Sequence, residues 1–206
     1  MCGVRRGQDS PIVVEFARSR NLSHLVIVLG SAQSCGEMLK NLTPHLQLNS
    51  VLDIQPDMLR ALGVEGLLLD LDETLKDYFA DGFRPEVVAW VEQMRREQVR
   101  MCILTNGRAR RVEPLAAQLG VTCVPWALKP FTRGVRAGIA KLGLDRTRVA
   151  MVGDQIFADV LAGRRAGVFT ILVRPTTTRE PWNTRIKRPL ERLVLRKIAA
   201  ANSDKH

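Results

Sequence analysis

The chain has 206 residues, of which 46% are hydrophobic and 25% are charged. This composition is typical of a globular protein with one sizeable core or two small ones, and it excludes a disordered chain, a collagen and a multipass membrane protein. The formal net charge of +10 favours an anionic partner, which leaves nucleic acid, phosphorylated metabolites and an acidic membrane surface open.

The first 37 residues contain no interpretable motif, and we expect a poorly ordered extension, with Met38 as the natural start. The longest apolar run, residues 25–30, is far shorter than the roughly 20 residues that span a membrane, and its flanks do not make a signal peptide. The four cysteines show no paired spacing, which predicts reduced thiols. We therefore expect a cytoplasmic protein without a transmembrane segment.

From Gly66 onward, short β-rich runs alternate with helical ones. Residues 66–71 form a continuous apolar run, as in a strand buried on both faces of a parallel sheet. Four further strands are expected at residues 99–104, 121–124, 148–152 and 168–173. Helices are expected from Pro85, from about Pro114 to Leu119, over residues 131–142 and over residues 157–166. This alternation predicts a doubly wound α/β domain over residues 38–173.

Polar side chains follow four of these strands at their carboxyl ends, where open α/β sheets bind ligands. The first strand runs into two carboxylates that point the same way on an extended chain, and the second ends in a hydroxyl and an amide. A lysine follows the third strand and two more carboxylates follow the fourth. The set comprises Asp70, Asp72, Thr105, Asn106, Lys129, Asp154 and Asp159.

Phosphoryl transfer requires these groups. One carboxylate attacks phosphorus to form an aspartyl-phosphate, and a second protonates the leaving oxygen and later activates water. Oxygen ligands hold Mg²⁺, while a lysine and a hydroxyl hold the phosphoryl oxygens. Because four carboxylates would otherwise repel one another, the cluster itself implies a divalent cation.

Each residue taken singly also has a structural explanation. Lys129 precedes a proline, as in many solvated loops; Asp154 and Asp159 would cap a helix; and Thr105 would begin an ordinary turn. Their joint order at successive strand ends favours the site over these explanations.

The series DxDxT, a hydroxyl residue, a lone lysine and GDxxxxD resembles the four motifs of the haloacid dehalogenase superfamily of phosphatases. The resemblance implies that Asp70 is the nucleophile and Asp72 the general acid/base. The implied Mg²⁺ ligands are Asp70, Asp72 through its main-chain carbonyl, Asp154 and, as a ligand or a support, Asp159. The implied phosphate-binding residues are Thr105, Lys129 and, as an assisting group, Asn106.

The intervals from Thr74 to Thr105 and from Thr105 to Lys129 leave no room for an inserted cap domain, so the fold is expected to be uncapped. An open site suits a phosphate at the end of a large or surface-bound substrate, or a site that a partner completes. From Met38 to about Arg196 the chain is similar to the YqeG-type branch of class IIIA of this superfamily, which is related to phosphatidylglycerophosphate phosphatases.

The features that match this branch are a leader ending in a leucine-rich helix, the lack of a cap, GDQ in the fourth motif and a basic end. The resemblance implies that phosphatidylglycerophosphate is dephosphorylated to phosphatidylglycerol. One departure is Glu73, where many members have asparagine, and we expect this added carboxylate to alter metal affinity.

The last 33 residues, 174–206, carry nine basic and three acidic side chains. Apolar residues recur at helical spacing over residues 190–198, which predicts a partly helical basic segment. Such a helix would dock on an anionic bilayer or pack on the domain, and both alternatives stay open. Arg108, Arg110 and Arg111, next to Thr105, are candidates to contact a substrate headgroup.

The sequence thus predicts a Mg²⁺-dependent phosphomonoesterase that acts on an anionic phospholipid, in the cytoplasm and peripheral to the inner face of a membrane. One alternative is the same chemistry on a nucleic-acid end, a phosphoprotein or a small phosphate ester. Another is an inactive domain that serves as a basic adaptor for a membrane or nucleic acid. The presence of both Asp70 and Asp72 argues against inactivity, and the scarcity of aromatic residues beside the basic ones argues against nucleic acid.

Overall fold

The computed structural model describes residues 3–4, 14–15 and 40–176. Strands β1 (Gly3–Val4) and β2 (Val14–Glu15) pair antiparallel. Apart from these residues and residues 174–176, the expectations for the first 37 residues and for the basic tail lie outside the described residues.

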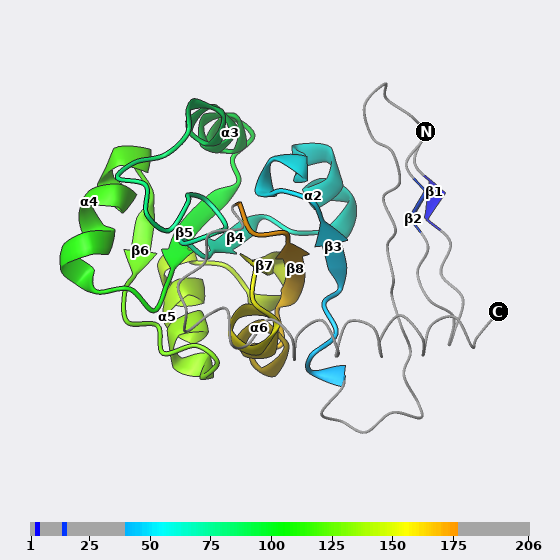
Figure 1. Cartoon of the computed structure of the whole chain (residues 1–206). Helices are drawn as coiled ribbons and strands as arrows, with labels where there is room; N and C mark the ends of the chain where they lie inside the picture. The colour runs from blue at the N-terminus through cyan, green and yellow to red at the C-terminus, as the bar shows by residue number, and fades with distance from the viewer. Residues whose placement is uncertain (1–2, 5–13, 16–39, 177–206) are drawn as a thin grey trace.

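A parallel sheet of six strands, in the order β3-β8-β7-β4-β5-β6, forms the centre of the described domain (Figure 1). The strands are β3 (Leu46–Leu48), β4 (Gly66–Leu69), β5 (Arg100–Leu104), β6 (Thr122–Val124), β7 (Val149–Gly153) and β8 (Phe169–Val173). The chain adds β5 and β6 on one side of β4, then returns to add β7 and β8 on the other. This reversal between β4 and β7 confirms the predicted doubly wound α/β fold.

Helices cover both faces of the sheet (Figure 1). They are α2 (Pro56–Leu62), α3 (Pro85–Arg96), α4 (Ala109–Leu119), α5 (Thr132–Leu142) and α6 (Leu161–Ala166), with short turns η1 (Val51–Asp53), η2 (Arg146–Arg148) and η3 (Ile156–Val160). The expected leucine-rich helix of the leader is α2. Helix α4 begins at Ala109, five residues before the expected start, and the helix expected over residues 157–166 is divided into the π-type turn η3 and α6.

Alternation along the strands divides the apolar side chains between two cores. Leu67 and Leu69 of β4 point into the core shared with α2, α3 and α4, whereas Leu68 points into the core shared with α5 and α6. Both sets are fully buried, because the helices shield the sheet on each side. The apolar run that predicted a central strand is therefore explained by burial on two faces.

Strand β3 was not among the predicted strands, and it extends the sheet beyond β8. His45, just before β3, is bound to Thr170 of β8: its main-chain NH donates to the Thr170 carbonyl at 3.0 Å, and its Nδ1 accepts from the Thr170 NH at 3.0 Å. Its ring also stacks on Phe169 with the centroids 4.7 Å apart. These contacts join segments 125 residues apart in the chain.

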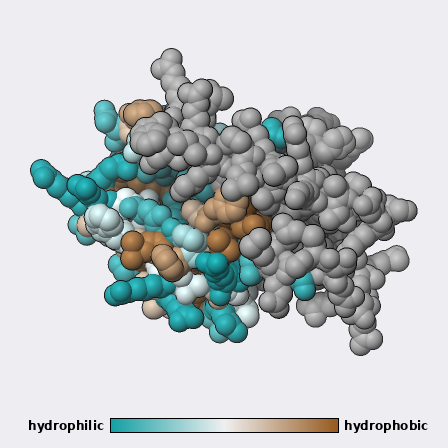
Figure 2. Space-filling model, turned by 60° about the horizontal axis from the view of Figure 1, so that its bottom comes forward, coloured by the Kyte–Doolittle hydropathy of each residue, from teal (hydrophilic) through white to brown (hydrophobic). Residues whose placement is uncertain are grey.

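The segments after β4 and β5 each hold one helix before the next strand, so residues 70–121 contain no inserted cap domain, as expected. None of the helices among the described residues is long and apolar enough to cross a membrane. On the face seen in Figure 2, small apolar areas are set among hydrophilic side chains over the described part of the chain.

Candidate active site

Asp70 and Asp154 lie at the point where the order of the strands reverses. Leu69 of β4 is in register with Val152 of β7, and the Asp70 NH donates to the Val152 carbonyl at 2.9 Å. Each aspartate comes just after the carboxyl end of its strand. The ladder that pairs β4 with β7 thus fixes the backbone positions of both carboxylates in the crevice where sheets of this type bind ligands.

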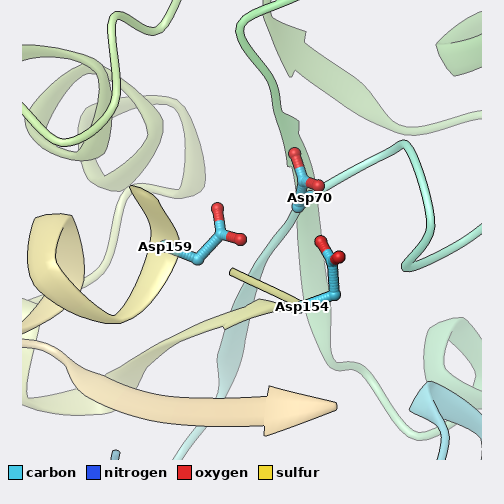
Figure 3. Close-up of side chains that lie close together, drawn as sticks. All are labelled: Asp70, Asp154 and Asp159. Atoms are coloured by element: carbon cyan, nitrogen blue, oxygen red, sulfur yellow. The ribbon is translucent and has the colours of Figure 1, made fainter. Parts of the chain in front are cut away.

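Asp159 completes a group of three buried carboxylates with Asp70 and Asp154. Ligand atoms of the three lie within 4.8 Å of one another, and the side chains of Asp154 and Asp159 point toward Asp70 (Figure 3). Asp159 comes from η3, and its carboxylate accepts from the Gln155 NH at 3.1 Å. A Cβ added at Gly153 would lie 2.2 Å from the Asp159 carboxyl carbon, so the glycine of the GDQ motif makes room for this acid.

Lys129 supplies the positive charge of the cluster. Its Nζ donates to Asp70 at 2.5 Å and to Asp159 at 2.6 Å, and all three side chains are buried. Burial alone would lower the pKa of Lys129, but Asp159 and Asp70 outweigh it and raise this pKa. Burial raises the pKa of Asp70 to about 7, because the opposing effect of Lys129 does not outweigh burial together with the charges of Asp159 and Asp72.

The donor set fits a magnesium ion. Three carboxylates in one small volume are hard oxygen ligands, and Mg²⁺ takes one or two carboxylates together with substrate phosphate and water. A divalent cation would also remove the excess negative charge that burial leaves uncompensated. Asp70, Asp154 and Asp159 are the side chains that would hold it.

The Asp72 carboxylate lies outside this group of three. It forms an ion pair with Arg111, one turn into α4, and both side chains are partly exposed. A contribution of Asp72 to a metal would therefore come from its main-chain carbonyl, as the family resemblance implies. Its side chain is partly exposed, so water can reach it, as the predicted role of general acid/base requires.

Thr105 and Asn106 follow β5, next to β4 in the sheet. The buried Thr105 hydroxyl accepts from the Gly107 NH at 3.1 Å. The Asn106 amide makes two bonds to the backbone of Lys129: its Nδ2 donates to the Lys129 carbonyl at 3.1 Å, and its Oδ1 accepts from the Lys129 NH at 2.8 Å. These two bonds position the lysine, and the expected assistance of Asn106 in phosphate binding stays a prediction.

The three arginines after Thr105 differ in their surroundings. Arg111 lies over the Tyr78 ring, 5.4 Å from its centroid, in addition to its ion pair with Asp72. Arg108 lies 5.9 Å from the Trp126 centroid, and Arg110 is exposed on α4. Arg111 is therefore the arginine that directly contacts a predicted catalytic residue.

Comparison with known proteins agrees with this geometry. The family model of haloacid dehalogenase-like hydrolases matches residues 33–167. The chain belongs to this family. It is 31% identical over 152 residues to the probable phosphatase YqeG of Bacillus subtilis, covering 74% of this chain and 88% of that protein. The predicted resemblance to the YqeG-type branch is confirmed.

A more distant relative is the chloroplastic phosphatidylglycerophosphate phosphatase 1 of Chlamydomonas reinhardtii, which is 27% identical over 158 residues. The match covers 72% of this chain but 59% of that protein's length. Among solved structures, the cobalt-bound deoxy-D-mannose-octulosonate 8-phosphate phosphatase of Haemophilus influenzae is 16% identical, with a TM-score of 0.45, and the match covers 54% of this chain and 68% of that one.

In this haloacid dehalogenase-like hydrolase, Glu73 does not point into the group of three acids. Its carboxylate accepts from the Tyr78 NH at 2.9 Å and from the Thr176 hydroxyl at 3.2 Å, and its backbone adopts a φ of 62°. The structure therefore does not support the expectation that Glu73 is a carboxylate beside the metal. It joins the first motif to the loop that follows and to the end of β8.

Lys76, two residues after the first motif, is a buried lysine that was not predicted. Its side chain is buried, with 2% relative exposure, and its Nζ donates to the carbonyl of Asp77 at 2.8 Å. Burial lowers the pKa of Lys76. The sequence contained a signal for this residue: Lys76 follows the DxDxT motif closely, and the other charged residues of segment 70–81 are all acidic.

Proposed function

We propose that the chain is a Mg²⁺-dependent phosphomonoesterase that forms an aspartyl-phosphate on Asp70 and acts on phosphatidylglycerophosphate. The observation that carries the chemistry is the convergence of Asp70, Asp154 and Asp159 with Lys129 in one buried cluster. Membership of the haloacid dehalogenase-like hydrolases supports the same class of reaction.

The roles of the residues follow from their positions. An oxygen of Asp70 attacks phosphorus while the bond to the leaving alcohol oxygen breaks, and Asp72 protonates that oxygen. Asp72 then takes a proton from water, whose oxygen attacks the phosphorus, and the bond to Asp70 breaks to release inorganic phosphate. Lys129 and Thr105 hold the phosphoryl oxygens. When bound, Mg²⁺ stabilises the negative charge on the phosphoryl group.

Two observations support a lipid substrate. The absence of a cap among residues 70–121 leaves the mouth of the site open to a phosphate on a large or surface-bound molecule. One relative is a phosphatidylglycerophosphate phosphatase, although this chain spans 59% of its length. We propose accordingly that the protein is cytoplasmic and peripheral to the inner face of a membrane.

Phosphate release tests the proposal. The substrates are phosphatidylglycerophosphate in anionic vesicles, 5′- and 3′-phosphorylated oligonucleotides and small phosphate esters, each with Mg²⁺ and with a chelator. We expect Mg²⁺-dependent release from the lipid, and a loss of at least about a thousandfold in Asp70→Asn, because the amide is not a nucleophile.

Asp81→Asn is the matched control, since Asp81 is an exposed acid in the loop after the first motif. It should retain activity. Preferential release from oligonucleotides or small esters would keep the chemistry and replace the substrate. No release from any of them would favour an inactive adaptor, and release unaffected by Asp70→Asn would refute the nucleophile.

A further inference from the structure

The large apolar side chains that are well exposed within residues 40–176 gather on two loops. They are Tyr78, Phe79, Trp126, Leu128 and Phe131, with relative exposures from 38% to 70%. One loop connects β4 to α3 and the other connects β6 to α5. We call these five side chains the apolar rim. Concentrated apolar exposure of this kind marks an interaction surface more often than scattered exposure does.

The apolar rim borders the active site. Both of its loops leave the carboxyl ends of their strands, and the loop after β5 lies between them, because β5 pairs with β4 on one side and β6 on the other. The Trp126 NH donates to the Gly107 carbonyl and the Ala127 NH to the Thr105 carbonyl, each at 3.0 Å. Leu128 directly precedes Lys129 in the chain. The two loops of the apolar rim therefore flank the loop that carries Thr105 and adjoin Lys129.

Buried polar groups hold the first loop so that its apolar side chains face outward. Lys76 and Glu73 are both buried. The Lys76 Nζ donates to the Asp77 carbonyl, and the Glu73 carboxylate accepts from the Tyr78 NH. Tyr78 and Phe79 are exposed despite these anchors, and their rings meet edge to face with centroids 5.0 Å apart. Tyr78 and Phe79 are thus exposed on a loop whose backbone is held by hydrogen bonds from buried side chains.

The second loop achieves the same result through its backbone conformation. Trp126 and Leu128 have φ values of 50° and 55°, in the left-handed region that residues with side chains seldom adopt. Ala127 between them is buried, with 2% relative exposure. The two neighbours consequently project outward, with exposures of 55% and 52%.

Arginines accompany the apolar rim. The guanidinium of Arg108 lies over Trp126, and that of Arg111 lies over Tyr78. Arg84, Arg110 and Arg133, on or next to the same three loops, are exposed as well, whereas the exposed acids on or next to these loops are Asp81 and Glu86. A surface that combines aromatic rings with arginine complements the interface of an anionic bilayer, where rings lie at headgroup depth and arginines meet phosphates.

We propose that the apolar rim docks the open mouth of the site directly onto an anionic phospholipid bilayer. This inference rests on the proposed function, since a lipid phosphate is the group that such docking would deliver to Asp70. It differs from docking by the basic tail, because the surface is formed by the loops that carry the catalytic motifs. A second copy of the chain or another protein would be the competing occupants.

Vesicle binding of the full chain tests this proposal. The vesicles contain phosphatidylcholine with about one-third phosphatidylglycerol and no phosphatidylglycerophosphate. The test variant is Phe79→Ser/Phe131→Ser, which removes the two most exposed side chains of the rim. We expect its binding to weaken at least about tenfold relative to wild type, with turnover of a small soluble phosphate ester retained.

A charge-matched pair tests the orientation. Arg108→Glu reverses a charge beside Trp126 of the apolar rim, whereas Arg96→Glu makes the same change at the end of α3, shortly before the amino end of β5. We expect weaker vesicle binding in the first variant alone. Equal binding by wild type and the double serine variant, or equal loss in the two glutamate variants, would overturn the proposal. So would wild-type binding that does not exceed binding to pure phosphatidylcholine.

The outcome is separable from that of the proposed function. If vesicle binding depends on the rim but phosphatidylglycerophosphate is not hydrolysed, docking stands and the substrate is wrong. If the lipid is hydrolysed in detergent micelles while rim variants bind vesicles normally, the substrate stands and docking is wrong. A fall in oligomeric state in the double serine variant, without a change in vesicle binding, would assign the rim to contact between copies.

Discussion

Two clusters of ionisable groups in this domain differ in charge: one has an excess of buried acids, and the other is built around a neutral histidine. At the carboxyl ends of the strands, three acids are buried together and one lysine forms ion pairs with two of them, so the acids outnumber the cation. At the β3 edge, His45 lies between Thr170 and Arg164, and burial followed by the Arg164 charge lowers its pKa to about 4. His45 is therefore neutral near pH 7, and both of its ring nitrogens have partners, in Thr170 and Arg164.

This difference separates a functional cluster from a structural one. The His45 contacts consist of hydrogen bonds and a ring stack that join two strands, and added charge would only disturb them. Burial opposes full ionisation of the acid cluster, and a bound cation would offset this cost.

Removal of the cationic partner should most strongly disrupt the acid cluster. Lys129→Met leaves Asp70 and Asp159 buried without their ion-pair partner, and we expect a loss of about 3–5 kcal/mol in the free energy of unfolding, measured in urea without Mg²⁺. Lys141→Met, at an exposed lysine, is the control. Adding Asp159→Asn to Lys129→Met should restore part of the lost stability. If Lys129→Met is as stable as wild type, the buried acids do not need the lysine as an ion-pair partner.

The next largest effect is expected from a side chain added at Gly153, where the Asp159 carboxylate leaves no room for it. A Cβ there would lie 2.2 Å from the Asp159 carboxyl carbon, so Gly153→Ala must displace this acid or the strand. We expect a destabilisation of about 3 kcal/mol and weaker Mg²⁺ binding by calorimetry. Gly82→Ala is the matched control, because the nearest atom to its added Cβ would be 3.9 Å away. Equal behaviour of the two variants would show that Asp159 tolerates displacement.

Protonation of His45 should weaken the β3 edge. Because the folded-state pKa is about 4 and the unfolded value about 6.5, the unfolded chain binds the proton first as the pH falls. Stability should then be full above pH 6.5 and decline toward pH 4, by on the order of 2 kcal/mol. Comparison of urea unfolding at several pH values for wild type and His45→Gln isolates this effect. Identical pH dependence in both proteins would mean that His45 does not contribute.

The sequence predicted well the strands that lead into the acid cluster, because the signal for them lies within the strands' own residues. Gly66–Leu69 and its neighbours are apolar on both faces, so their type and their ends could be seen without knowledge of the fold. The catalytic acids follow directly from such ends. Family motifs then added roles that spacing alone does not define.

The missed features depend on distant partners or unusual local structure. Strand β3 has three residues, and its place follows from Thr170, far along the chain. Helix α4 contains Pro114 in its interior, which suggested a helix start at that residue, but burial of Val112, Ala116 and Leu119 holds the whole segment helical. The apolar rim was invisible in the sequence, because exposure of a tryptophan or phenylalanine depends on the backbone of its loop.

The pH dependence of metal binding gives the finest test of the contrast between the clusters. With the pKa of Asp70 raised to about 7, the metal-free folded state holds a proton between pH 4 and 7 that the unfolded chain releases. Ionisation of Asp70 therefore costs stability as the pH rises through this range. Mg²⁺ must displace the same proton, so its affinity should rise by up to about tenfold per pH unit below pH 7 and level off above it.

Calorimetric titration of the full chain with Mg²⁺ at pH 5.5 to 8.5 measures this rise, and buffers of different ionisation enthalpy reveal the released proton. Asp70→Asn should bind Mg²⁺ weakly and without this pH dependence, and should be more stable than wild type in metal-free solution at pH 8. A flat affinity profile in wild type would place Asp70 in the ionised state before the metal arrives. The acid cluster would then be balanced by groups other than a bound cation, and its contrast with the His45 cluster would disappear.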